Sequence, residues 1–136
     1  MGVAQGLYLL IQSGTNNLAP GFAYGELPEN QLSASAPMAW TYRTITSRPT
    51  YTINGQVSFT SWNVQIDSHG TTQAYADQMS NAIDGVLRGV WSGTMSDSQS
   101  TIVNGIFKTN TDITGFRDEN KSFVRSLGYT VQYYQQ

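Results

Sequence analysis

The chain has 136 residues, of which 39% are hydrophobic and 12% aromatic, enough for one core that needs no disulfide or metal to hold it. It contains no cysteine, which excludes disulfides and thiolate metal sites, and its net charge of −2 argues against a protein that binds nucleic acid through phosphates. Only 12% of the residues are charged, about half the usual share. A polar but weakly charged surface costs less to desolvate and suits a subunit that packs against neighbours.

The N-terminal part predicts a helix, a short edge strand and a loop. Gly14 and the asparagines after it are suited to end the helix, and Pro20 and Pro28 bound the strand. Residues 29–36 form a polar loop. The start of the chain carries no basic residue and only a short apolar run, so we expect neither a secretory signal nor a membrane span. The apolar residues on one face of the predicted helix are Val3, Leu7, Leu10 and Ile11.

A long β-hairpin is predicted next. Apolar residues alternate with small or polar ones over Met38–Thr46, which indicates a strand with one buried face. Asn54 and Gly55 form the turn, because both central residues of such a turn take positive φ. The returning strand covers Val57–Asp67, and a change in its apolar phase predicts a bulge near Thr60–Ser61.

The strongest helical pattern follows the hairpin. Thr71 or Thr72 is the expected N-cap, and Arg88 suits the C-terminal end. Asp77 and Asp84 share a helix face away from the apolar stripe, so we expect both carboxylates to face solvent. The apolar residues at helical spacing are Tyr75, Met79, Ala82, Ile83, Val86, Leu87 and Val90.

The C-terminal part predicts a polar turn over 92–98, a long strand over Thr101–Lys108, a loop over Thr109–Asn120 and a regular last strand over Phe123–Tyr133. The whole pattern predicts an α+β fold of one domain. We expect an antiparallel β-sheet with a long β-hairpin, packed against an N-terminal helix and one central amphipathic helix.

Residues able to support chemistry are sparse. His69 is the single histidine and follows Asp67 and Ser68, but three consecutive residues do not converge in the geometry of a catalytic triad. We interpret this segment as the end of a strand leading into the helix. One histidine and no cysteine provide no ligand set for zinc, and there is no glycine-rich phosphate loop. We therefore predict no enzyme, no cofactor and no catalytic or metal-binding residue.

Four stretches resemble the phage tail-completion (tail-terminator) family. Pro37–Ile45 resembles that family's proline and aromatic opening of a strand, and Trp62–Asp67 resembles its strand ending in Gln-Ile-Asp. Tyr75–Leu87 is similar to the helix that follows, and Tyr24–Pro28 is similar to the short strand before a proline near the family's start. The resemblance extends over nearly the full chain.

The resemblance implies one tail-terminator-like domain over residues 1–136, in a structural virion protein of a tailed phage. Such a protein is assembled in the host cytoplasm and lies at the head-proximal end of the tail. It forms a homohexameric ring that terminates tail-tube polymerisation and joins the tail to the head. The expected partners are further copies of the chain, the tail-tube protein and the head-tail connector protein. DNA only passes through the lumen, and no membrane is involved.

Two alternatives remain open. The first is another ring subunit of the neck or tail, such as a connector or a tube protein. The second is a small cytoplasmic ligand-binding domain, which would need a polar constellation in a pocket.

The candidate functional residues are expected contacts with other subunits. Pro49 indicates that the hairpin tip stands clear of the sheet and is free to make an axial contact. The tip residues are Arg48, Tyr51, Asn54 and Gly55. Trp91, just past the central helix, either anchors an interface or packs over the helix end. A cluster of charged residues is expected either to line the lumen or an inter-subunit seam, or to form an exposed loop. Its members are Arg117, Asp118, Glu119 and Lys121.

Overall fold

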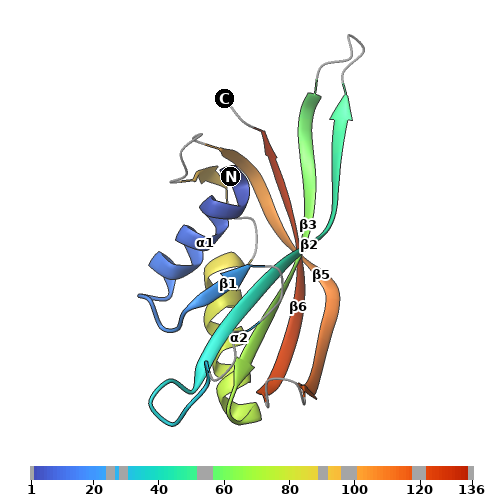
Figure 1. Cartoon of the computed structure of the whole chain (residues 1–136). Coiled ribbons are helices and arrows are strands. Elements are labelled where there is room, and N and C mark those ends of the chain that lie inside the picture. Colours follow the sequence, from blue (N-terminus) through green and yellow to red (C-terminus); the bar gives the residue numbers. More distant parts are fainter. Residues whose placement is uncertain are drawn as a thin grey trace.

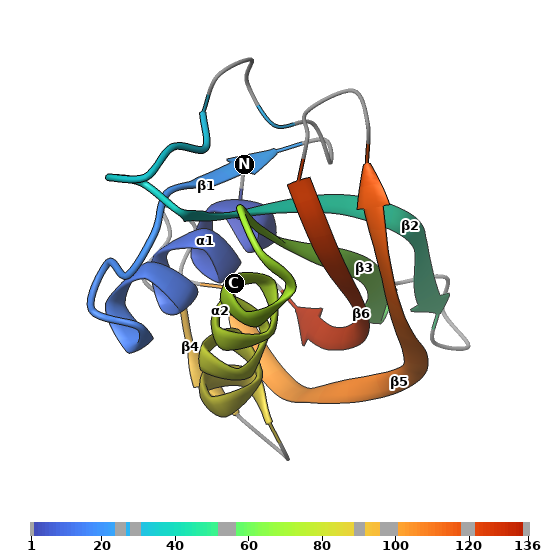
Figure 2. The ribbon, with the colours of Figure 1, turned by 90° about the horizontal axis from the view of Figure 1, so that it is seen from below.

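The computed structural model describes residues 2–23, 27, 31–51, 57–88, 92–95, 101–117 and 122–134. In chain order the elements are α1 (Gly2–Gly14), β1 (Gly21–Ala23), β2 (Met38–Tyr51), β3 (Val57–Gly70), α2 (Gln73–Leu87), β4 (Gly93–Thr94), β5 (Ile102–Arg117) and β6 (Ser122–Tyr134). The strands form a six-stranded sheet in the order β1-β2-β3-β6-β5-β4. This sheet curls around α1 and α2, which lie on the same side of it (Figures 1 and 2). The predicted α+β fold, with a long hairpin and these two helices, is confirmed.

The sequence predicted an antiparallel sheet, but the sheet is mixed because one strand pair is parallel. The edge strand β1 pairs with β2 in parallel, from Gly21 opposite Trp40 to Ala23 opposite Tyr42. A parallel neighbour requires a connection long enough to carry the chain back along the sheet, and residues 24–37 supply one. All other strand pairs are antiparallel. The edge position predicted for this short strand is confirmed.

The first helix ends where the sequence predicts. Asn16 and Asn17, just after α1, both have a φ of 55°, a left-handed conformation that asparagine adopts more readily than most residues. Their amides bond back to the carbonyls of Ser13 and Gln12 at 3.2 and 2.7 Å, which closes the helix end.

The second helix has the predicted N-cap but a different buried face. Thr72 has extended backbone geometry, and its hydroxyl accepts a hydrogen bond from the Tyr75 amide at 3.3 Å. Tyr75 itself is exposed, so its predicted place on the buried stripe is wrong. The buried face instead includes two polar residues, Ser80 and Asp84, which a hydrophobic pattern cannot detect. Asp84 has hydrogen-bond partners in the interior, whereas the Ser80 hydroxyl has none among the described residues. The buried residues of α2 are Ala76, Met79, Ser80, Ile83, Asp84 and Leu87.

The β2–β3 hairpin is longer than predicted, and its irregularities lie elsewhere. β3 pairs with β6 in unbroken register from Thr60 to Gly70, so the bulge predicted near Thr60–Ser61 does not lie at these residues but two positions earlier in β3. The extra residues are Ile45 in β2 and Ser58 in β3. A bulge in either strand shifts the apolar phase of the pair, which is why the sequence of one strand alone does not locate it.

The first residues of β2 are buried on both faces. Trp40 faces the helices and is buried as predicted, but Ala39 and Thr41, on the opposite face, are also fully buried. The prediction of one buried face is therefore wrong at this end of the strand. A threonine gives no sign of such burial, because its hydroxyl can find a partner in the interior.

β5 continues through the segment predicted as a loop. It pairs with β6 from Ile102 to Lys108 and again from Asp112 to Arg117, and Thr109–Thr111 form an irregular bulge between the two halves. The short strand β4 lies in the segment predicted as a polar turn and pairs with the start of β5. The second half of β5 is rich in threonine and contains a glycine, and this composition led to the prediction of a loop. Threonine nevertheless favours strands.

Candidate functional site

The β2–β3 hairpin projects past the ends of the neighbouring strands (Figure 1). Arg48 lies on its first arm and is exposed, and Tyr51 is the last residue of β2. Asn54 and Gly55, the predicted turn, lie outside the described residues, but the antiparallel pairing up to Tyr51 opposite Val57 confirms the hairpin. Only the end of the hairpin stands clear of the sheet, because β3 pairs with β6 up to Thr60, opposite Pro49. Arg48 therefore lies within the paired sheet, and Tyr51 lies beyond it.

The other predicted contact residues are mostly outside the described part of the chain. Arg117 is the last residue of β5, where its backbone pairs with Ser122. It therefore belongs to a strand and not to the predicted loop. The residues outside the described ranges are Trp91, Asp118, Glu119 and Lys121.

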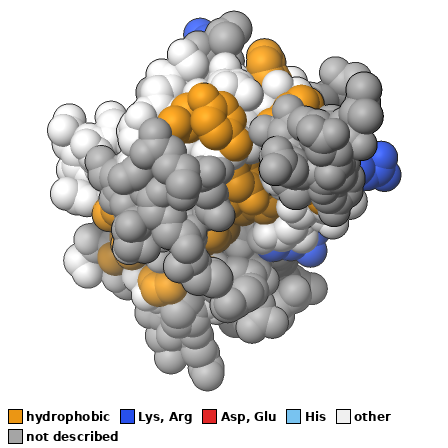
Figure 3. All heavy atoms as spheres, turned by 90° about the horizontal axis from the view of Figure 1, so that it is seen from above, with side chains coloured by type: hydrophobic (Ala, Val, Ile, Leu, Met, Phe, Trp, Pro, Cys, Tyr) orange, Lys and Arg blue, Asp and Glu red, His pale blue; other side chains and the backbone are white. Residues whose placement is uncertain are grey.

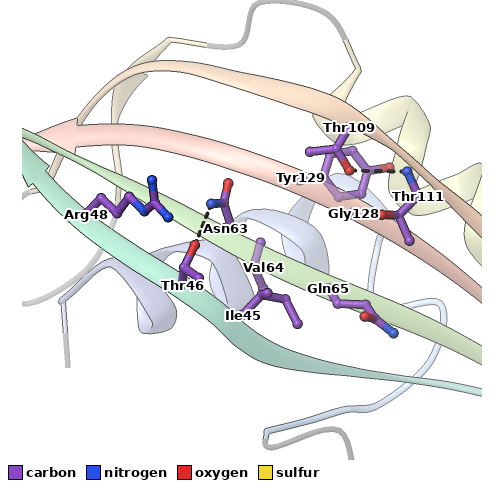
Figure 4. Close-up of a pocket in the computed structure, with 10 residues that line it drawn as sticks. All are labelled: Ile45, Thr46, Arg48, Asn63, Val64, Gln65, Thr109, Thr111, Gly128 and Tyr129. Carbon is purple, nitrogen blue, oxygen red and sulfur yellow. Dashed lines mark hydrogen bonds between the residues drawn. The ribbon is translucent and has the colours of Figure 1, made fainter.

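A shallow groove of about 410 Å³ crosses β2, β3, β6 and β5 on the sheet face away from the helices (Figure 4). Asn63 lies between two threonines: its amide donates to Thr46 Oγ1 at 2.6 Å, and its carbonyl oxygen accepts from Thr130 Oγ1 at 2.6 Å. Hydroxyls and amides that satisfy one another offer polar contacts and no activated nucleophile. The groove is lined by Ile45, Thr46, Arg48, Asn63, Val64, Gln65, Thr109, Thr111, Gly128 and Tyr129.

Gly128 shapes the floor of this groove. A Cβ atom on it would meet the Thr109 hydroxyl and lie 3.1 Å from the Thr111 Cβ, so the β5 bulge can approach β6 only because this residue has no side chain. The sequence shows Gly128 as one small residue in a regular strand, with no sign of the bulge that packs on it.

Large apolar side chains are exposed at several places. Ile45 is 53% exposed at the β2 bulge, and Ile113 and Phe116 are 62% and 51% exposed in the second half of β5. Apolar side chains also gather in a hollow at the end of the molecule from which the hairpin projects (Figure 3). Exposed apolar groups of this size suit contacts with another protein. The remaining exposed members are Leu9, Leu18, Tyr75, Phe107 and Tyr134.

Asp84 is buried against the sheet, so its predicted exposure to solvent is wrong. Its carboxylate accepts a hydrogen bond from the Tyr129 hydroxyl at 2.8 Å and from Arg88 at 3.1 Å, and Lys108 Nζ lies 3.8 Å away. Burial acts to raise the pKa of Asp84, but the bonds from Tyr129 and Arg88 and the charge of Lys108 outweigh it, so this pKa lies below its ordinary value. Burial, together with the bond to Asp84, raises the pKa of Tyr129.

A second ionic group lies nearer the surface. Arg125 donates to both oxygens of Asp112 at 3.1 Å, and its other nitrogen lies 3.8 Å from Asp77. The hydrogen bond from Arg125 lowers the pKa of Asp112 and raises that of Arg125. Asp77 is half-buried, so its predicted solvent exposure is only partly correct. These ion pairs connect α2 and β5 to β6, and the carboxylates of Asp77 and Asp112 each have Arg125 as a partner.

His69 is fully buried and connects two strands. Its Nε2 lies 3.0 Å from Thr41 Oγ1 in β2, and its Nδ1 lies 3.1 Å from Ser122 Oγ in β6. Ser122 is also fully buried, so this serine–histidine pair is closed to solvent and to substrate. Ser68, next to His69 in the chain, points to the opposite sheet face. The arrangement connects strands and does not form a catalytic triad.

Neither a metal-binding cluster nor a membrane-spanning helix is found in the described ranges. They contain no group of three or more His, Cys, Asp or Glu side chains placed to hold a metal ion. Neither of the helices described is long and apolar enough to cross a membrane.

Comparison with known proteins shows a likeness of fold. No protein-family model matches the chain, and no curated protein matches it in sequence. A chain in the solved structure of the virion of a native gene transfer agent particle is similar, with a TM-score of 0.67 and 8% sequence identity. The match covers 99% of this chain and 96% of that chain. At this identity the likeness shows that the two chains share a fold from end to end.

Proposed function

We propose that this chain is a structural virion protein of a tailed phage and acts as the tail terminator. The observation that carries the proposal is the end-to-end fold similarity to a chain of a gene transfer agent virion. The match extends over 99% of this chain and 96% of the other, so it includes the hairpin, both helices and the whole sheet. The sequence resemblance to the tail-completion family supports the same class.

The distribution of polar groups also supports an assembly role. The serine–histidine pair and the Asp84 carboxylate are buried and occupied by neighbouring side chains, where they hold strands and α2 together. The exposed features are a projecting hairpin, a groove on the sheet face away from the helices and several large apolar side chains. Such features recognise protein surfaces and have no evident use in turning over a small substrate.

In the proposed mechanism a homohexameric ring caps the tail tube. Each subunit contacts its neighbour through two different surfaces, since a closed cyclic ring uses heterologous contacts. One face of the ring meets the last tube subunits and stops their polymerisation, and the other meets the head-tail connector protein. DNA passes through the lumen. The location is the head-proximal end of the tail.

The projecting hairpin supplies one of the axial contacts. Tyr51→Ala combined with Arg48→Glu should leave the subunit folded, since Tyr51 is the last residue of β2 and Arg48 is exposed, and should disturb tail length or head joining. Tails of normal length that join heads normally would remove the hairpin from the proposal. The charge reversal of Arg117 and Lys121 tests the second predicted contact in the same way.

The mass of the assembled protein is the first test of the function. Light scattering on the chain alone, and on a mixture with its cognate tail-tube protein, should reveal six copies of the 14.9 kDa chain, about 89 kDa, or tubes capped at a fixed length. Long filaments of the chain itself would indicate a tube protein instead. A monomer that neither binds nor limits tubes would favour a ligand-binding domain.

A further inference from the structure

Two stretches of strand edge have no neighbour among the described residues. β1 pairs with β2 only as far as Tyr42, so from Arg43 onward no described strand lies beside the outer edge of β2. β4 pairs with β5 only at Ile102 and Val103, and the rest of β5 forms the outer margin of the sheet (Figure 1). An open edge presents unpaired amides and carbonyls that can pair with another chain.

Each open edge carries an exposed isoleucine on the same face of the sheet. Ile45 lines the groove beside Gln65, on the face away from the helices (Figure 4). Ile113 pairs with Ser126, which pairs with Asp67, and Asp67 lies two residues from Gln65, so Ile113 is on that face too. If a second molecule placed its β2 beside β5, the two isoleucines would cover each other.

The β5 edge also has room for a side chain. A hollow of about 130 Å³ lies next to Ile113, and its lining includes Gly115, Val124 and Ser126. A Cβ atom built on Gly115 would meet no heavy atom within 4 Å, so the space above it is open. The hollow therefore fits an apolar side chain brought by a neighbour.

Strand directions favour a second copy in the same orientation. The strands β2, β3, β6 and β5 alternate in direction across the sheet. A second molecule added in the same orientation beyond β5 would therefore place its β2 antiparallel to β5 and continue the alternation. A foreign strand would cover one open edge, whereas copies of this chain added head to tail cover both.

We propose that Ile113–Arg117 of one copy pairs with Arg43–Arg48 of the next, with the bulge residue Ile45 seated in the hollow above Gly115. The β2 bulge then brings Ser47 opposite Thr114 on the helix side of the joined sheet. The pairing stops at residue 49, a proline, which has no amide hydrogen to donate. This contact rests on the proposed function, since it supplies the heterologous seam that a ring requires.

Cysteine pairing tests this seam directly, because the chain has no native cysteine. Ser47→Cys and Thr114→Cys are each made in the full-length chain, at exposed positions. The two proteins are oxidised separately and as a mixture under conditions where the wild type assembles. We expect disulfide-linked dimers only in the mixture, and a ladder ending at a closed ring when both cysteines are in one chain.

A substitution at Gly115 tests the hollow. Gly115→Val adds a side chain where the subunit has open space, so its melting temperature should stay within about 3 °C of the wild type. Its self-assembly should weaken by about tenfold or more, because the added atoms occupy the place of Ile45 from the neighbour. Ile113→Lys should act in the same direction. Leu18→Lys, at an exposed apolar residue away from both edges, is the matched control and should assemble normally.

The outcomes separate the seam from the proposed function. Rings that form without cross-linking in the mixture, and that tolerate Gly115→Val, would place the seam elsewhere and leave the tail-terminator function standing. Dimers formed by Thr114→Cys alone would mean that β5 pairs with its own copy about a two-fold axis, which also overturns the seam. A wild-type chain that neither assembles nor binds tubes would refute the function and the seam together.

Discussion

Ile106 in the first half of β5 has no accessible surface, whereas Ile113, seven residues later in the same strand, is among the most exposed apolar side chains. The two halves are separated by the bulge at Thr109–Thr111. Before the bulge the strand faces α2 and contributes to the core, and after it the strand runs along the open margin of the sheet. One strand can thus serve folding at one end and, in the proposed seam, assembly at the other, because a bulge changes what the chain packs against.

The largest expected effect lies in the first half. Ile106→Ala should lower the free energy of unfolding by about 3 kcal/mol, because it leaves a cavity in a fully packed site. Ile113→Ala, the matched change in the second half, should alter it by less than about 0.5 kcal/mol. Urea denaturation of both variants measures the contrast. Equal losses would mean that the second half also belongs to the core.

The next largest effect is expected at Asp84, whose carboxylate lies near Lys108 in the first half of β5. Asp84→Ala should cost about 2 kcal/mol of unfolding free energy, because the buried Tyr129 hydroxyl loses its acceptor. Asp84→Asn keeps an acceptor and should cost less. Thermal unfolding of the two variants side by side provides the measurement, and a harmless Asp84→Ala would contradict the role given to the bond.

The same carboxylate predicts a pH dependence. The pKa of Asp84 is lower in the folded chain than its unfolded value of about 3.9, so its contribution to stability is present above that pH and is lost as the pH falls through the folded pKa. The stability difference between the wild type and Asp84→Asn should therefore stay constant from pH 7 to about 5 and shrink below about 4. A difference that persists in strong acid would point to packing and not to charge.

The bulge between the halves can be tested at Gly128. Gly128→Ala should cost about 1 kcal/mol, since the new methyl group meets the Thr109 hydroxyl and Thr111. Gly128→Ala with Thr109→Ala removes part of the clash and should recover some of the loss, which denaturant titration of the single and double variants can detect. No difference between them would place the strain elsewhere.

The smallest effect is expected in the second half. Asp112→Asn removes the nearer of the two ionic partners of Arg125, but the Asp112 side chain is 44% exposed. A solvated pair of this kind contributes little, so the change should stay within about 0.5 kcal/mol and should diminish further in high salt. Denaturation at low and high ionic strength measures it. A large loss that salt does not reduce would show that the pair is held in a drier site.

Local sequence patterns predicted the positions of helices and strands better than they predicted the burial and contacts of individual side chains. The spacing of Leu7 and Ile11 located α1, Thr72 marked the start of α2, and the Asn54-Gly55 pair indicated the hairpin whose arms the structure describes. These signals are local, because caps, turns and periodicity depend on residues close in sequence. The hairpin that carries the proposed contact could be predicted for the same reason.

Features that depend on distant partners could not be predicted. Asp84 looks like a solvent residue until Tyr129, 45 positions later, supplies its partner. Gly115 and Ile113 looked like parts of a loop, and their strand is recognised only through pairing with β6. The open edges are likewise a property of the sheet order, which no single segment encodes.

The central pairing of β3 with β6 has a consequence for how the chain folds. The pairs β2–β3 and β5–β6 are hairpins between neighbours in the chain, but β3 meets β6 across α2, β4 and β5, with Thr60 opposite Tyr133. Closing so long a loop costs more chain entropy than closing either hairpin. We therefore expect two hairpins to form early and their joining along β3 and β6 to limit the folding rate, so that a freshly made subunit exposes two half-sheets until α2 packs across them.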